Sequence, residues 1–255
     1  KVAFSNDSQF THAIAFDPHT QGRFILCYTN TTASAYVGAL IVGTVSGNSI
    51  SFGNQYVFHN ASVTTRVEIA FDPNNSGKFV ISFQQTNHWL IVGQISGSSV
   101  STGTAQLVST PSLSKSKVIF DPNTVNQFIY IYSDPNNSYY GTIKICTIAN
   151  TVITIGSSTV FSSSTCQHGV EAGLLGSSGK FAVGLSFGDT VSLIIGTISG
   201  SSVTFGSVQT VSTSLQQLRM ATQVNSVIIA GRHTSNSYIG SCVVGTVTGT
   251  VATFG

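Results

Sequence analysis

The chain carries one short segment five times. The segment Val42-Gly43-Thr44-Val45-Ser46-Gly47 returns, with substitutions, at residues 92–97, 145–150, 195–200 and 244–249. A period of roughly 40–50 residues, made of short apolar runs and Gly/Ser turns, is typical of one four-stranded sheet per repeat, the blade of a β-propeller. We therefore predict an all-β fold, a five-bladed β-propeller with four antiparallel strands per blade. It would be a single domain over residues 1–255, with repeats at about 5–58, 59–108, 109–161, 162–211, and 212–255 plus 1–4.

The second repeat shows the strands most clearly. Residues 67–71 form a β-prone run, and the turn residues Asp72-Pro73-Asn74-Asn75-Ser76-Gly77 follow it. Proline fixes φ in such a turn, and glycine supplies positive φ. We expect further strands at residues 78–83 and 89–95 and a fourth from Val100. The near-continuous apolar character of the middle strands predicts sheets that are covered on both faces.

The two ends of the chain predict closure of a ring. The last repeat stops at Thr253-Phe254-Gly255, without the second half of its outer strand. That half stands at the other end of the chain, where Lys1-Val2-Ala3-Phe4 resembles the Val57-Phe58 segment of the first repeat. We expect this N-terminal strand to close the last blade, which would remove the exposed strand edges of an open stack. The alternative, an open solenoid, would leave residues 1–5 without a partner.

Composition excludes several classes of function. With 41% apolar residues, 25 Gly and only 7% charged residues, the chain reads as a packed β protein. A net charge of +2 gives no basic surface for nucleic acid. No apolar run approaches the roughly 18–20 residues that span a bilayer, so we expect no membrane insertion.

Charged residues recur at one position of the innermost strands. Aligned on Glu68, this column reads Ala13, Glu68, Lys117, Glu171 and Arg219, which predicts an axial ring of four charges that pair in a hydrated tunnel mouth. The alternative is a five-bladed glycosidase with Glu68 and Glu171 as acid and base. Lys117 and Arg219 would hold both glutamates ionised, which disables a general acid. We therefore predict that the chain has no catalytic residues and is not an enzyme.

The loops between the second and third strands vary most, and they carry aromatic side chains. Such rings beside Asn and Ser either stack on sugars, anchor a protein partner or merely cap the blades. The candidate binding face consists of Tyr36, His88, Trp89, Tyr139, Tyr140 and Tyr238.

Neither a metal nor another cofactor is predicted. Asp17, Asp72 and Asp121 recur in Phe-Asp-Pro hairpins, where a short carboxylate accepts backbone N–H bonds of its own turn. The 6 histidines show no ligand spacing. The 4 cysteines occupy different radii in different blades, so we expect free thiols.

Two segments carry a resemblance to known families. Residues 238–247 and 195–206 resemble the tandem propeller-type repeats of phage tail and fibre proteins and of marine microbial surface proteins, and the resemblance covers all five copies. The blade count is also similar to that of tachylectin-type lectins, although their Trp-rich repeats are absent and Trp89 is the single Trp.

These observations favour a structural or interaction module. Low charge with a mean hydropathy of +0.28 indicates surface that is hidden against neighbours. We expect a rigid propeller subunit of an extracellular or virion-like assembly, with other protein subunits as partners. The alternative is a lectin that binds glycans at shallow sites between blades on the loop face.

Overall fold

The computed structural model describes residues 2–5, 8–32, 35–61, 66–109, 115–167, 169–234 and 239–255. Sheet 1 contains β1 (Ser8–Phe16), β2 (Arg23–Thr32), β3 (Ala35–Ser46) and β4 (Ser49–His59). Sheet 2 contains β5 (Val67–Phe71), β6 (Lys78–Gln84), β7 (His88–Ser96) and β8 (Ser99–Thr102), with β9 (Gln106–Ser109) also paired to β7. Sheet 3 contains β10 (Ser116–Phe120), β11 (Gln127–Asp134), β12 (Tyr140–Ala149) and β13 (Val152–Thr165), and the 3-10 turn η1 (Pro135–Asn137) joins β11 to β12.

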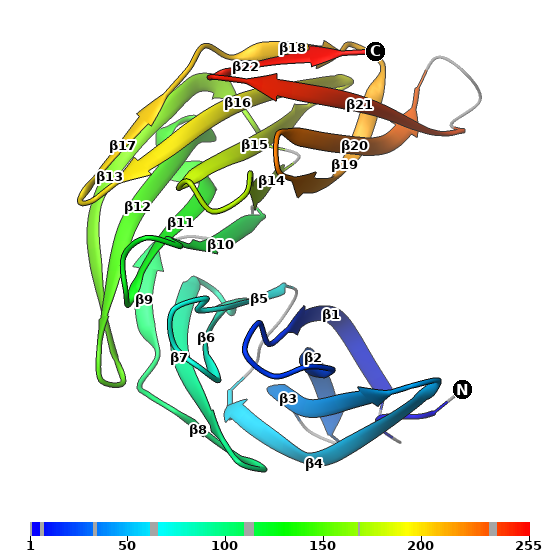
Figure 1. Ribbon diagram of the computed structural model, residues 1–255, viewed down its shortest axis with the longest axis vertical. Coiled ribbons are helices and arrows are strands. Elements are labelled where there is room, and N and C mark those ends of the chain that lie inside the picture. The colour runs from blue at the N-terminus through cyan, green and yellow to red at the C-terminus, as the bar shows by residue number, and fades with distance from the viewer. Residues whose placement is uncertain are drawn as a thin grey trace. The chain divides into compact units, whose positions relative to one another are not determined.

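Sheets 4 and 5 follow the same plan (Figure 1). Sheet 4 contains β14 (Gly169–Leu174), β15 (Lys180–Phe187), β16 (Thr190–Ser199) and β17 (Ser202–Phe205), with β18 (Gln209–Ser212) also paired to β16. Sheet 5 contains β19 (Leu215–Gln223), β20 (Ser226–His233), β21 (Gly240–Thr248) and β22 (Val251–Phe254). Each sheet is antiparallel and keeps chain order, which confirms the predicted fold class: all-β, with the five four-stranded sheets of a five-bladed β-propeller.

The last residue of the repeated segment lies in a tight hairpin turn. Gly97 has a φ of +60°, and Asn150 at the same position of the third repeat has a φ of +56°. Glycine adopts this left-handed conformation without a steric penalty, and asparagine tolerates it better than most residues. The turn geometry therefore explains why asparagine is the residue that replaces glycine there.

The second residue of the repeated segment makes room for an aromatic ring. Gly93 lies opposite Phe79 in the β6–β7 ladder, and a Cβ added to Gly93 would overlap the Phe79 ring. The same overlap occurs for Gly43 with Phe24 and for Gly196 with Phe181. Glycine at this position thus lets a Phe ring lie flat across the sheet.

The registers confirm the predicted alignment of the inner strands. The residues of the charged column each lie opposite the corresponding residue of the second strand in their own sheet. The pairs are Ala13 with Cys27, Glu68 with Ser82, Lys117 with Ile131, Glu171 with Gly184 and Arg219 with Ala230.

Each sheet has two faces, which we name by these pairs. The front face carries the second-strand residue of the pair and its neighbours two positions away, such as Ile25 and Cys27 in sheet 1; the back face carries the alternate residues, such as Phe79 and Ile81 in sheet 2. In the buried core between sheets 1 and 2, the front face of sheet 1 packs on the back face of sheet 2. Two further cores repeat the arrangement, with the front of sheet 3 on the back of sheet 4 and the front of sheet 4 on the back of sheet 5.

The chain divides into two compact units. The first comprises Lys1–Ser112 and Thr147–Ile155, and the second comprises Leu113–Cys146 and Gly156–Gly255. The tip of the β12–β13 hairpin belongs to the first unit because the Thr151 carbonyl packs directly against Gly103, where a Cβ would overlap it. The glycine that follows an outer strand therefore leaves the space into which the tip of the next hairpin packs. Gly206 and Thr250 repeat this contact in the second unit.

The expected N-terminal closing strand would join the two units, so it stays a prediction. Val2–Ser5 lie outside any strand, and sheet 5 consists of β19 to β22 alone among the described residues. Phe4 instead packs on the back face of sheet 1, with ring centroids 5.2 Å from Tyr28 and 6.0 Å from Phe52. An aromatic cluster in the first repeat thus holds the Phe4 side chain.

Within the described ranges, no helix is long and apolar enough to cross a membrane.

Candidate interaction surfaces

Three of the four predicted axial charges meet in the second unit. Glu171 on β14 lies between Lys117 on β10 and Arg219 on β19, with Lys117 Nζ 3.0 Å from Glu171 Oε2 and Arg219 Nη1 3.0 Å from Glu171 Oε1. The side chains of Glu171 and Lys117 are 8% and 20% exposed, whereas that of Arg219 is 68% exposed. A buried carboxylate is thus held by one half-buried and one solvated cation.

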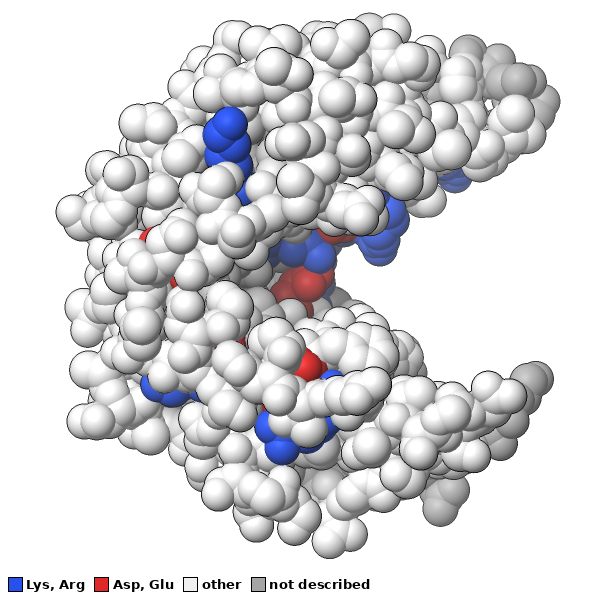
Figure 2. Space-filling model, in the orientation of Figure 1, with Lys and Arg blue, Asp and Glu red and all other residues white. Residues whose placement is uncertain are grey.

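Glu68 belongs to the first unit, so the four-membered ring stays a prediction. It is half-buried on β5, opposite Ser82. Figure 2 shows how few charged side chains interrupt the otherwise uncharged surface on this side of the molecule. Both carboxylate oxygens of the other glutamate, Glu171, form ion pairs, one with Lys117 and one with Arg219. Neither oxygen is therefore placed to protonate a leaving group.

The predicted aromatic binding face is only partly present. Tyr36 is exposed and packs against Phe10 with ring centroids 5.7 Å apart. His88, however, is fully buried, because β7 begins at this residue and pairs it with Gln84 on one side and Ser109 on the other. His88 therefore does not belong to the binding face. Tyr238 lies outside the described residues.

Tyr139 and Tyr140 follow the 3-10 turn of sheet 3 and are half-buried. Tyr139 has a φ of +58°, an unusual conformation for an aromatic residue. Its carbonyl oxygen accepts hydrogen bonds from Cys166 N at 2.9 Å, Cys166 Sγ at 3.2 Å and Ser133 Oγ at 3.3 Å. These three donors hold the strained backbone of Tyr139 in place, which is a feature often associated with binding sites.

Trp89 and His59, a residue that the sequence did not single out, both lie next to Phe83. Trp89 is opposite Phe83 in the β6–β7 ladder, and the His59 ring lies 4.7 Å from the Phe83 ring. Trp89 Nε1 and His59 Nε2 are buried and have no hydrogen-bond partner in the described structure. Burial lowers the pKa of His59, and a hydrogen bond with Gln85 acts in the opposite direction.

The hairpin aspartates are turn residues. Asp72 Oδ1 accepts a hydrogen bond from Asn74 N at 2.8 Å, and Asp17 and Asp121 bind the N–H of His19 and Asn123 in the same way, each at 2.9 Å. All three carboxylates are buried in their own turns. Within the described ranges, no group of three or more His, Cys, Asp or Glu side chains is arranged to hold a metal ion.

The four cysteines are unbridged, as we expected from their positions. Cys27, Cys146 and Cys166 are buried, and Cys242 on β21 is exposed. Burial raises the pKa of the Cys146 thiol to about 12 and that of Cys166 to about 11, and it raises that of Cys27 strongly.

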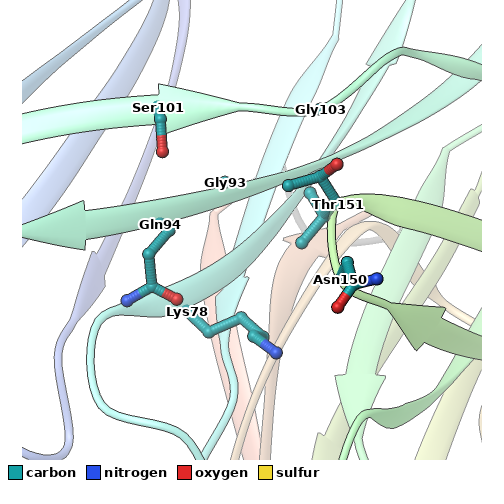
Figure 3. Close-up of a pocket in the computed structure, with 8 residues that line it drawn as sticks. Lys78, Gly93, Gln94, Ser101, Gly103, Asn150 and Thr151 are labelled. Carbon is teal, nitrogen blue, oxygen red and sulfur yellow. The ribbon is translucent and has the colours of Figure 1, made fainter.

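One cleft lies in the first unit, where the β12–β13 hairpin meets sheet 2. Lys78 and Gln94 border it on one side, and Asn150 and Thr151 border it on the other (Figure 3). Its volume of about 20 Å³ is enough for a water molecule. Small-molecule sites are usually ≈ 300–1,000 Å³, so this cleft is too small for such a ligand.

Two sheet faces expose large apolar side chains. On the back face of sheet 1, Ile14 is 59% and Phe16 is 60% exposed. On the front face of sheet 5, Ile228 and Val244 lie opposite each other in the β20–β21 ladder and are 47% and 53% exposed.

No family model matches the chain, and no curated protein matches its sequence. Among solved structures, the chain is similar to Sqt1 of Saccharomyces cerevisiae, with 9% identity over 96% of this chain and 82% of that chain, at a TM-score of 0.55. It is also similar to a mutant Aleuria aurantia lectin in complex with alpha-methyl-L-fucoside, with 10% identity over 97% of this chain and 94% of that chain, at a TM-score of 0.52. A third similar structure is the acylaminoacyl peptidase of Pyrococcus horikoshii, with 7% identity over 93% of this chain but 38% of that chain, at a TM-score of 0.50. These likenesses support the β-propeller fold and do not extend to activity.

Proposed function

We propose that the protein is a non-enzymatic interaction module, a rigid β-propeller subunit of an extracellular or virion-like protein assembly. The observation that carries this proposal is the exposed aromatic pair of sheet 1, where Phe10 and Tyr36 are 51% and 46% exposed with ring centroids 5.7 Å apart. Contiguous exposed apolar surface of this kind marks protein interaction sites. The repeat resemblance to phage tail and microbial surface proteins fits the same role.

The site chemistry also favours binding over catalysis. The carboxylate of Glu171 is engaged by Lys117 and Arg219, which opposes its use as a general acid. The cleft at Lys78 has the volume of a water molecule rather than of a substrate. Both features support a protein that works through its surface.

A lectin is the second candidate, and two local features favour it. Trp89 carries a buried indole N–H without a partner, and Tyr139 is held in a strained conformation at the edge of sheet 3. Aromatic rings of this kind suit stacking on a sugar. The likeness to the lectin in complex with alpha-methyl-L-fucoside is compatible with this alternative.

Binding of bis-ANS and a glycan array decide between the two candidates. An interaction module binds the dye reversibly at this aromatic pair, and Phe10→Asp and Tyr36→Asp each reduce the dye signal. Val125→Asp, at an exposed hairpin position, is the matched control and leaves the signal unchanged. Saturable glycan binding that is lost in Trp89→Phe or Tyr139→Ala would assign the function to a lectin instead. Wild-type protein that does not bind the dye would contradict the exposed aromatic pair on which the module depends.

A further inference from the structure

A β-bulge in β1 decides which face of sheet 1 carries the Phe10 ring. Along β1, Ala13 belongs to the front face and His12 to the back face. Regular alternation would place Thr11 on the front and Phe10 on the back. The register instead shifts between Phe10 and His12, which sets Phe10 opposite Thr29 on the front face. Bulges of this kind re-aim a side chain, and this one re-aims an aromatic ring.

Two hydroxyl groups hold the bulge in place. Thr11 Oγ1 and Thr29 Oγ1 lie 3.1 Å apart and share a hydrogen bond. Thr29 is fully buried, so the bulge is anchored to the interior of the sheet. The backbone at Phe10 is therefore set before any ligand arrives, which lowers the entropy that binding at this ring costs.

Tyr36 joins Phe10 on the front face. It lies opposite Thr31 in the β2–β3 ladder, two positions along β2 from the residue opposite Phe10. The two rings are 5.7 Å apart, with an angle of 52° between their planes, and each is about half exposed. The front face of sheet 1 packs on sheet 2 of the same compact unit, so the aromatic pair is described within that unit alone.

The neighbours of the aromatic pair are polar but uncharged. On the front face they are the side chains of Thr11, Thr29 and Thr31, together with Gly38 opposite Thr29. Residues 8–12, 29–32 and 36–38 include no Asp, Glu, Lys or Arg. The core of a protein–protein interface is more apolar than this, with further large apolar side chains beside its aromatic anchors. Ring faces bordered by hydroxyl groups suit a ligand that has an apolar face and a polar rim, and a sugar ring has both.

We propose that Phe10 and Tyr36 bind the apolar face of a neutral pyranose sugar. This inference rests on the proposed interaction module and names what its aromatic pair recognises, the glycan of a glycosylated partner. Stacking covers one face of the sugar and leaves the other in water, so the affinity for one sugar is low. A ligand of about a dozen non-hydrogen atoms binds with a Kd on the order of 1 mM. Several copies of the module in one assembly then strengthen attachment to a glycan-bearing surface.

Saturation-transfer NMR on the full chain tests the site. The probes are the methyl glycosides of galactose, glucose, fucose and N-acetylglucosamine, each titrated to about 10 mM because the expected Kd is on the order of 1 mM. A methyl sialoside is the charged comparison. We expect at least one neutral glycoside to bind, with saturation concentrated on the ring hydrogens of one face. The sialoside gains nothing from its carboxylate, because no cationic side chain lies among residues 8–12, 29–32 and 36–38.

Variants locate the binding at the aromatic pair. Phe10→Ala and Tyr36→Ala each weaken the affinity for the neutral glycoside about five- to tenfold. Phe10→Tyr and Tyr36→Phe keep the rings and bind like wild type, which separates the loss of a ring from a damaged fold. Phe16→Ala is the matched control, because it removes a ring on the opposite face of β1. Unchanged affinity in Phe10→Ala, or an equal loss in Phe16→Ala or Tyr139→Ala, overturns the proposal.

The dye experiment separates failure of the sugar site from failure of the interaction module. Protein that binds none of the neutral glycosides, but binds bis-ANS with a loss in Phe10→Asp, contradicts the sugar site and keeps the module, with a protein surface as its partner. Protein that binds neither the glycosides nor the dye contradicts both. Binding of the sialoside alone also overturns the sugar site, because it requires a cationic side chain that the aromatic pair does not have beside it.

Discussion

Phe79 lies across Gly93 in the β6–β7 ladder, and the ring occupies the space that a side chain at residue 93 would need. The same pairing in sheets 1 and 4 joins Phe24 to Gly43 and Phe181 to Gly196. A residue of the sequence repeat that looks like a turn signal is therefore a packing residue inside a strand. The repeat is maintained by the shape of the core as well as by its turns.

Gly93→Ala tests this pairing. The added Cβ overlaps the buried Phe79 ring, which must leave its position in a close-packed core. We expect a loss of about 1–3 kcal/mol in the free energy of unfolding, measured by urea denaturation. Gly53→Ala is the control, because its Cβ would lie 3.6 Å from Val42 O in ordinary contact. Equal stabilities of the two variants would contradict the role of Gly93.

The ion pairs of Glu171 predict an asymmetric response. Glu171→Gln leaves the half-buried Lys117 ammonium without its counter-charge, so we expect a loss of about 1–3 kcal/mol in the free energy of unfolding. Arg219→Gln removes a partner that is 68% exposed, so we expect a change of about 0–1 kcal/mol. Urea denaturation at low and high salt measures both. A larger loss for Arg219→Gln than for Glu171→Gln would refute this account.

Local features were predictable because they depend on neighbouring residues. The strand at residues 67–71 and the hydrogen bond from Asn74 N to Asp72 follow from β-propensity and turn chemistry. The register of the charged column followed from the repeat, because a slip by one residue would turn every apolar side chain to the other face. The contact of Lys117 and Arg219 with Glu171 is a consequence of that register.

Features that depend on distant segments were not predictable. His88 reads as a loop residue, but its pairing with Ser109 of β9 places it inside a sheet. Phe4 resembles a strand residue of the last repeat, but three aromatic rings of the first repeat, His12, Tyr28 and Phe52, pack around it.

His59 makes the stability of the protein sensitive to acid. Burial lowers its pKa in the folded state below the ordinary value of 6.5. The unfolded chain therefore binds the proton first as the pH falls, so stability is lost as the pH drops below about 6.5. His59→Phe keeps the ring contact with Phe83 and removes the titration, and we expect a flatter dependence of unfolding free energy on pH between 7 and 5. An unchanged slope in this variant would show that another group is responsible.

Cys166 makes the stability of the protein depend on pH in the opposite direction, with a loss at high pH. Burial raises its pKa to about 11 from an ordinary value of 9.0. The unfolded chain loses the thiol proton first as the pH rises, so the folded state loses stability between pH 9 and 11, on the order of 2 kcal/mol in total. Cys166→Ser keeps a donor for the Tyr139 carbonyl and removes this titration, so its unfolding free energy falls less steeply over the same range. Cys242→Ser, at an exposed position, is the matched control, and a slope for Cys166→Ser as steep as that of the control would rule out the buried thiol as the cause.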